Sequence, residues 1–103
     1  MIGTIFLLAL IVFEFFADIF AKQWSLSGSL SKLVLAFLTY LLANSAWLWA
    51  LRKGITLSRG ALLFSVSSAI LAFVIGVFIF KEPTSRFQLL GALFGVIALL
   101  LLA

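Results

Sequence analysis

The sequence contains no cysteine and no histidine. The chain can therefore form no disulfide, carries no thiol nucleophile and lacks the ligands that hold most zinc and haem groups. Acidic residues are also scarce, because Asp and Glu together occur only 3 times in 103 residues. We expect no metal site and no cofactor.

Charge of either sign is rare. Only 10% of the residues are charged, 66% are hydrophobic, and the mean hydropathy is +1.39. A soluble domain has about 25% charged residues, so this composition is typical of an integral membrane protein with the lipid bilayer as its surroundings. The 7 Lys and Arg residues give a net charge of +4 but are scattered between apolar runs. Without a basic cluster, we expect no nucleic-acid partner.

Catalytic patterns are missing as well. The serines have neither a histidine nor a positioned lysine to activate them, so no nucleophile–base pair is recognisable. No glycine-rich phosphate loop or other cofactor motif occurs in the sequence. We expect that the protein is not an enzyme.

Long apolar runs make up most of the chain. Each run is long enough to cross the hydrocarbon core of a bilayer as a helix, and none shows the alternation of a barrel strand. We expect the first run to be kept as a span rather than cleaved as a signal peptide. The prediction is an all-α integral membrane protein, with one domain over residues 1–103 and four transmembrane helices at about 2–21, 33–51, 60–80 and 87–103.

Basic residues are divided almost evenly between the two sides of this predicted topology. Four lie on one side and three on the other: Lys22, Lys32, Lys81 and Arg86 against Arg52, Lys53 and Arg59. The positive-inside rule therefore favours neither orientation, and the chain is expected to insert in both. Two antiparallel copies would form the inverted repeat that many transporters use. We therefore predict an antiparallel, dual-topology homodimer.

Glu14 lies inside the first predicted span, after a run of uncharged residues at positions 2–13. A carboxylate at that depth costs roughly 3 kcal/mol on insertion scales, and such residues usually serve a function. Glu14 is predicted to bind a proton or an organic cation in competition, which is the basis of proton-coupled antiport. The alternative is a neutral carboxyl that is hydrogen-bonded inside the helix bundle.

Asp18 and Lys22 follow Glu14 at steps of four residues and share its helix face. Asp18 could be a second proton-binding group, or it could steer cations toward Glu14. The alternative is an ion pair between Asp18 and Lys22 near the interface, and the spacing favours this pair. Lys22 is otherwise expected to anchor the helix at the membrane boundary.

The second span carries an aromatic and polar face at Tyr40, Asn44 and Trp47. Tyr40 lies deeper and is the better candidate for cation–π contact with a substrate. Asn44 is expected to bond another helix or the substrate. Trp47 could line the site or belong to the aromatic belt at the membrane surface.

Small residues recur along the last two spans. One groove is formed by Ala61, Ser65, Ser68, Ala72 and Gly76. Packing against another helix is its favoured role, while Ser65 and Ser68 could also touch Glu14 or the substrate. In the last span, Gly91-xxx-Gly95 is a candidate helix-dimerisation face.

Several of these features resemble the small multidrug resistance family, within the drug/metabolite transporter superfamily. The resemblance covers the whole length and rests on four short-looped spans, Phe13-Glu14 with Lys22 eight residues after the Glu, an aromatic at Tyr40, and the exit Phe78-Ile79-Phe80-Lys81-Glu82-Pro83. It implies an antiparallel dimer that exchanges protons for cations through paired glutamates, here Glu14. It also implies that the last helix, with Gly91 and Gly95, makes the main dimer contact.

The chain departs from the family pattern in its third span, so the resemblance is to a divergent member. Family members usually have a Tyr and a Trp early in this span, followed by glycines. Those positions are Ala61 and Phe64, then Val66 and Ser68. In addition, Ala17 stands where guanidinium exporters have a Trp, and Asp18 stands where small or hydroxyl residues are usual. Neither the guanidinium-export nor the multidrug signature is complete.

The sequence therefore predicts a proton-coupled exporter of small organic cations, of quaternary ammonium or guanidinium type, in a bacterial inner membrane. Protons are the coupling ion. Two alternatives remain open: a carrier of a lipid-linked or neutral metabolite, and a non-transporting membrane subunit. The candidate proton- and substrate-binding residues are Glu14, Asp18, Tyr40, Asn44, Phe64, Ser65 and Ser68.

Overall fold

Four helices follow the four apolar runs, in a computed structural model that describes residues 1–102. They are α1 (Ile2–Ser27), α2 (Leu30–Arg52), α3 (Leu57–Val74), which continues as the π-helical segment η1 (Ile75–Ile79), and α4 (Arg86–Leu102). No strand occurs within residues 1–102. The all-α prediction is thus confirmed for this part of the chain; Ala103, the last residue of the fourth predicted span, lies outside it.

Three of these helical segments are long and apolar enough to cross a membrane: α1, α2 and the continuous stretch Leu57–Ile79. The fourth helix, α4, is apolar but has only 17 residues, which corresponds to about 26 Å of helix. The structure is therefore that of a multi-pass membrane protein, and a fourth span through α4 stays a prediction.

The first connection is shorter than predicted. The predicted spans at about 2–21 and 33–51 leave eleven residues between them, but α1 continues to Ser27 and α2 begins at Leu30. The helix ends where Gly28 adopts a left-handed conformation with φ 67°, and the Gly28 N–H donates to the Trp24 carbonyl at 2.7 Å. The polar residues at this end can stay helical because the glycine, rather than their polarity, stops the helix.

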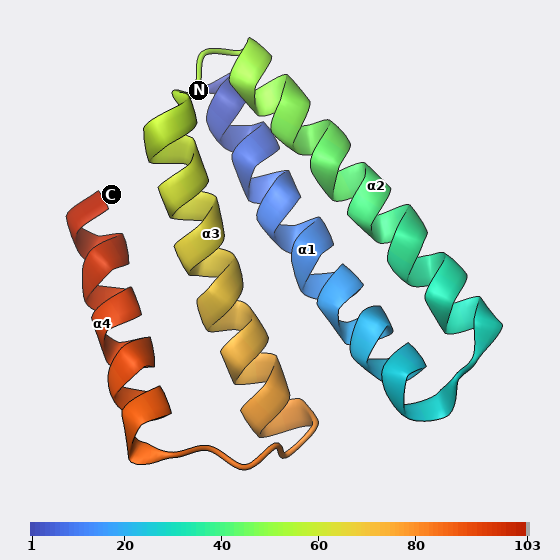
Figure 1. Cartoon of the computed structure of the whole chain (residues 1–103). Coiled ribbons are helices and arrows are strands. Elements are labelled where there is room, and N and C mark those ends of the chain that lie inside the picture. Colours follow the sequence, from blue (N-terminus) through green and yellow to red (C-terminus); the bar gives the residue numbers. More distant parts are fainter. Residues whose placement is uncertain (103) are drawn as a thin grey trace.

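The helices lie side by side in one layer, in the order α4, α3, α1, α2 (Figure 1). The described chain measures 40 × 35 × 15 Å, and its thinnest dimension is little more than one helix diameter of about 10–12 Å. The α2–α3 connection lies at the same end as the N-terminus, while the α1–α2 and α3–α4 connections lie at the other end (Figure 1). The layer leaves large apolar side chains exposed on all four helices.

Alanines allow α1 and α2 to pack closely. Ala36, Ala43 and Ala50, spaced seven residues apart on α2, are 3%, 0% and 0% exposed. Together with Ala46 they form a smooth face, and Leu7 and Leu10 of α1 belong to the same buried cluster as Ala43 and Ala46. Small side chains at a helix interface let the backbones approach, which is the usual means of helix association in lipid.

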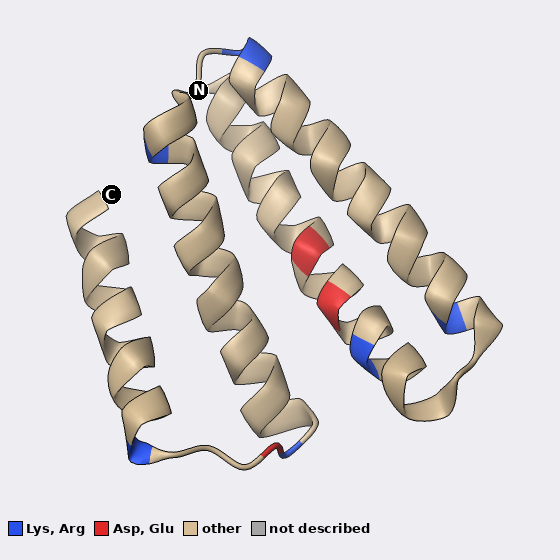
Figure 2. Cartoon of the chain, in the orientation of Figure 1, with Lys and Arg blue, Asp and Glu red and all other residues tan. Residues whose placement is uncertain are grey.

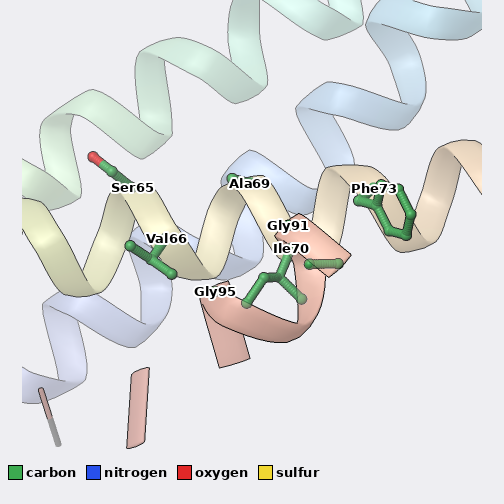
Figure 3. Close-up of a pocket in the computed structure, with 8 residues that line it drawn as sticks. Ser65, Val66, Ala69, Ile70, Phe73, Gly91 and Gly95 are labelled. Carbon is green, nitrogen blue, oxygen red and sulfur yellow. The ribbon is translucent and has the colours of Figure 1, made fainter. Parts of the chain in front are cut away.

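Packing between α3 and α4 is looser. A groove of about 330 Å³ lies between the two helices and is lined by Ser65, Val66, Ala69, Ile70, Phe73, Gly91, Ala92 and Gly95 (Figure 3). None of the residues of α4 is buried by the rest of the described chain. The α4 helix is therefore the element that depends least on the other three.

Candidate functional site

Two carboxylates lie on α1, at Glu14 and Asp18, about halfway along the helix, while Lys and Arg lie toward the helix ends and connections (Figure 2). Both acidic residues are half-buried in the single chain. Because α1 lies between α2 and α3 in the layer, groups from both neighbouring helices can reach this part of α1. The layer thus places the acidic groups at its centre.

Tyr40 of α2 contacts this acidic pair. Its hydroxyl donates a hydrogen bond to Asp18 Oδ1 at 3.1 Å. Tyr40 also lies within electrostatic reach of Glu14, as Asp18 does. The α1–α2 hairpin therefore brings three of the predicted site residues together, and we refer to Glu14, Asp18 and Tyr40 as the acidic centre.

Lys22 does not pair with Asp18 in the structure, contrary to what the four-residue spacing favoured. The Lys22 Nζ instead lies 2.7 Å from Glu82 Oε2 in the α3–α4 connection. Asp18 accepts its hydrogen bond from Tyr40. A contact across the fold has replaced the local ion pair because a second carboxylate reaches the amine from another element.

The end of the third helix places Glu82 at this position. The helix widens into η1, in which the Phe80 N–H bonds the Ile75 carbonyl at 3.2 Å. Lys81 then takes a left-handed conformation with φ 54°, and the Glu82 N–H returns to the Gly76 carbonyl at 2.9 Å. The Glu82 side chain lies so close to Gly76 that a Cβ at position 76 would collide with its carboxylate.

Two aromatic rings contact each other near the part of α1 that precedes the acidic centre. Trp47 of α2 and Phe64 of α3 are stacked, with ring centroids 6.3 Å apart and an interplanar angle of 30°. Both rings pack against the buried cluster that contains Leu10, one helical turn before Glu14. Phe64 was a candidate site residue, and its partner Trp47 forms the contact that links α2 to α3.

The other polar candidates lie outside the acidic centre of a single chain. Asn44 and Ser65 are exposed, Ser68 is half-buried, and none of the three is hydrogen-bonded to Glu14 or Asp18. Ser65 is at the rim of the α3–α4 groove, and its hydroxyl points away from Gly95 (Figure 3). The role of these three residues in a binding site therefore stays a prediction.

The two glycines of α4 differ in their surroundings. A Cβ at Gly95 would lie 3.3 Å from Ile70 Cδ1 of α3, whereas a Cβ at Gly91 would meet no atom within 4 Å. Gly95 therefore supports packing of α3 against α4 inside one chain. Gly91 leaves an open place on the same helix, and its role in a dimer contact stays a prediction.

The sequence patterns gave no role to Glu82, which was noted only as part of the exit motif at residues 78–83. It is the only acidic residue outside α1. Because the chain has only 3 acidic residues, this isolated position could have marked Glu82 as a candidate. Its contact with Lys22 was harder to foresee, because it depends on the left-handed turn at Lys81.

Comparisons with known proteins found no relative. No family model matches the chain, and neither the curated proteins nor the solved structures include a match. The resemblance to the small multidrug resistance family therefore stays a prediction from sequence motifs.

Proposed function

We propose that the protein is a proton-coupled antiporter that exports small organic cations of quaternary ammonium or guanidinium type. It acts in a bacterial inner membrane as an antiparallel homodimer and is a divergent member of the small multidrug resistance family. It has no enzymatic activity and needs no cofactor besides the coupling protons.

The observation that carries this proposal is the state of the two membrane-embedded carboxylates. No Lys or Arg forms an ion pair with Glu14 or Asp18 among residues 1–102, because Lys22 is bound to Glu82. An uncompensated charge in this position is costly, so each carboxylate favours either a proton or a bound cation. Competition between these two ligands for one site couples their movements in opposite directions.

Two further observations support the dimer. The single layer of helices exposes apolar side chains broadly, and α4 buries none of its residues within the chain. The basic residues are also divided four to three between the two ends of the layer, which gives neither orientation a clear advantage. A second, inverted copy would cover the open face and bring a second Glu14 to the site.

Transport is tested with purified protein in liposomes that carry a pH gradient. Guanidinium, an aryl-substituted guanidinium and a bulky quaternary ammonium are added in turn, and proton movement is followed with a pH dye. We expect at least one of these cations to drive proton flux in the wild type and none to do so in Glu14→Gln. Proton flux that is unaffected by Glu14→Gln would contradict the proposal.

The same assay separates the two alternatives. A membrane subunit would be inert by itself and would copurify with a partner, and a carrier of lipid-linked or neutral cargo would not respond to any of the small cations. Either result in folded, dimeric protein would overturn the cation-exporter assignment.

Orientation can be measured cleanly because the native chain has no cysteine. Thr56→Cys and Ser85→Cys place single thiols in connections at opposite ends of the layer. In cells, we expect an impermeant maleimide to label about half of each variant, since both orientations are populated. Complete labelling of one variant and none of the other would contradict the dual topology.

A further inference from the structure

We infer that Glu82 is a positioning residue for the acidic centre: by binding the Lys22 amine, it keeps this amine off Asp18 and leaves the Asp18 carboxylate open to a substrate cation. The inference rests on the proposed function and assigns a role in it to a residue outside the membrane-embedded site.

Lys22 can in principle reach either carboxylate. It follows Asp18 by four residues on α1, a spacing that brings the Cβ atoms of two helical residues to about 5–6 Å and allows an ion pair. In the structure its Nζ is 2.7 Å from Glu82 Oε2. The amine is therefore a cation of the protein itself that could occupy the same carboxylate as the substrate.

Glu82 is held in place to compete for this amine. The left-handed Lys81 and the hydrogen bond from the Glu82 N–H to the Gly76 carbonyl turn the chain back against η1. The absence of a side chain at Gly76 leaves room for the Glu82 carboxylate. Lys81 is the only residue other than glycine with a positive φ in the described chain, and such backbone strain persists where the surrounding structure requires it.

The charges around Asp18 make the effect specific. Asp18 accepts the Tyr40 hydroxyl and lies near Glu14, and neither group brings a positive charge. Lys32 of α2 has its amine 5.6 Å from the centroid of the Phe20 ring rather than on a carboxylate. Lys22 is therefore the cation best placed to neutralise Asp18, and Glu82 is the residue that decides whether it does so.

The Lys22–Glu82 pair is also open enough to exchange partners. The two side chains are 35% and 44% exposed, so water can replace either partner. If Glu82 loses its charge, the nearest carboxylate on the Lys22 helix face is Asp18. Glu82→Gln is therefore expected to move the amine to Asp18, whereas Lys22→Gln removes the amine altogether.

The first test detects this move directly and needs no substrate. Asp18 is the only aspartate in the chain, so protein grown with ¹³Cγ-aspartate and ¹⁵Nζ-lysine reports a single carboxylate. Solid-state NMR in lipid bilayers measures dipolar coupling between the two labels. We expect no close contact in the wild type, a close contact in Glu82→Gln, and its loss in the double variant Glu82→Gln/Lys22→Gln.

A matched control identifies the amine. Glu82→Gln/Lys32→Gln should keep the contact, because Lys32 is not the group that moves. A contact that is already present in the wild type, absent from Glu82→Gln, or removed by Lys32→Gln would overturn the inference.

The second test measures cation affinity by proton release from purified protein. Glu82→Gln should weaken binding about three- to fivefold, as expected for the loss of one partly exposed charge interaction. The double variant should return to wild-type affinity, and Lys22→Gln alone should bind at least as tightly as the wild type. A merely structural ion pair would instead make both single variants equally weak, and that result would overturn the inference.

The two tests separate this inference from the proposed function. Wild-type protein that releases no protons with any cation would contradict the proposed function, and the substrate part of the inference would fall with it. The NMR contact would still show whether Glu82 holds the Lys22 amine away from Asp18.

Discussion

The two hairpins of the chain differ in how tightly they pack. Between α1 and α2, the alanines at positions 43 and 50 are fully covered, and the connection is limited to residues 28–29. Between α3 and α4, a groove of about 330 Å³ remains, and none of the residues of α4 is buried. One hairpin is closed within the chain, and the other is left open.

This difference indicates that the two hairpins have different roles. The acidic centre is built within the closed hairpin, where the Tyr40 hydroxyl on α2 fixes Asp18 on α1. In the proposed transporter, the groups that bind the cation benefit from a rigid frame, because misplaced ligands lose affinity. The open hairpin instead offers an unfilled helix surface, which suits contact with a second copy.

The most disruptive change is expected at the closed interface. Ala43 is fully buried, so Ala43→Leu inserts a larger side chain into a packed interface. It should reduce stability by about 1–3 kcal/mol through overpacking. The matched change on the open hairpin is Ala69→Leu, at an exposed position that lines the groove, and it should be nearly neutral. Unfolding of both variants in a denaturing-detergent titration measures the difference, and equal losses would contradict the contrast between the hairpins.

Gly60 tests the link between α2 and α3. A Cβ at this position would lie 2.5 Å from Ile55 Cγ2 and 3.2 Å from Trp47, so Gly60→Ala should displace the Trp47 ring from Phe64. We expect a loss of about 1–2 kcal/mol in stability. Ser58→Ala, at an exposed position on the first turn of the same helix, is the control and should stay within about 0.5 kcal/mol of the wild type. A thermal melt in which the two variants behave alike would refute this packing.

Tyr40→Phe removes one hydrogen bond from the acidic centre and keeps the ring. Because a hydrogen bond contributes about 0.5–1.5 kcal/mol, cation affinity should fall about two- to tenfold. Thr39→Val is the matched loss of a hydroxyl from α2, since the Thr39 hydroxyl bonds only the Leu35 carbonyl of its own helix. It should leave affinity unchanged, as measured by proton release, and a similar fall in both variants would argue against a role for the Tyr40 hydroxyl.

The smallest effect is expected at the open interface. Gly95→Ala would bring its Cβ to 3.3 Å from the flexible end of Ile70, beside an unfilled groove, so the neighbour can move. We expect a change below about 0.5 kcal/mol in the free energy of unfolding. A loss as large as that of Gly60→Ala would show that α3 and α4 are held as firmly as the other helices.

The helices could be predicted from the sequence because long apolar runs allow few other structures in lipid. Their ends were less predictable. The first predicted span ends at residue 21, but the helix continues to Ser27 and ends at the left-handed Gly28. The seven-residue spacing of Ala36, Ala43 and Ala50 was visible in the sequence, and the structure shows that this stripe is the face covered by α1.

The candidate site was predictable in part. An acidic residue in an apolar run is conspicuous, so Glu14 and Asp18 stood out, and the structure brings Tyr40 to them. The partner of Lys22 was not foreseen, because local spacing pointed to Asp18 while Glu82 is sixty residues away along the chain. Contacts that depend on one unusual turn, here at Lys81, have no periodic signature in a sequence.

The most direct test of the central claim is proton release from purified, detergent-solubilised protein when a cation is added. If Glu14 binds protons and cations in competition, guanidinium or a quaternary ammonium compound will release protons from the wild type and none from Glu14→Gln. Folded, dimeric wild-type protein that releases no protons with any of these cations would contradict the account.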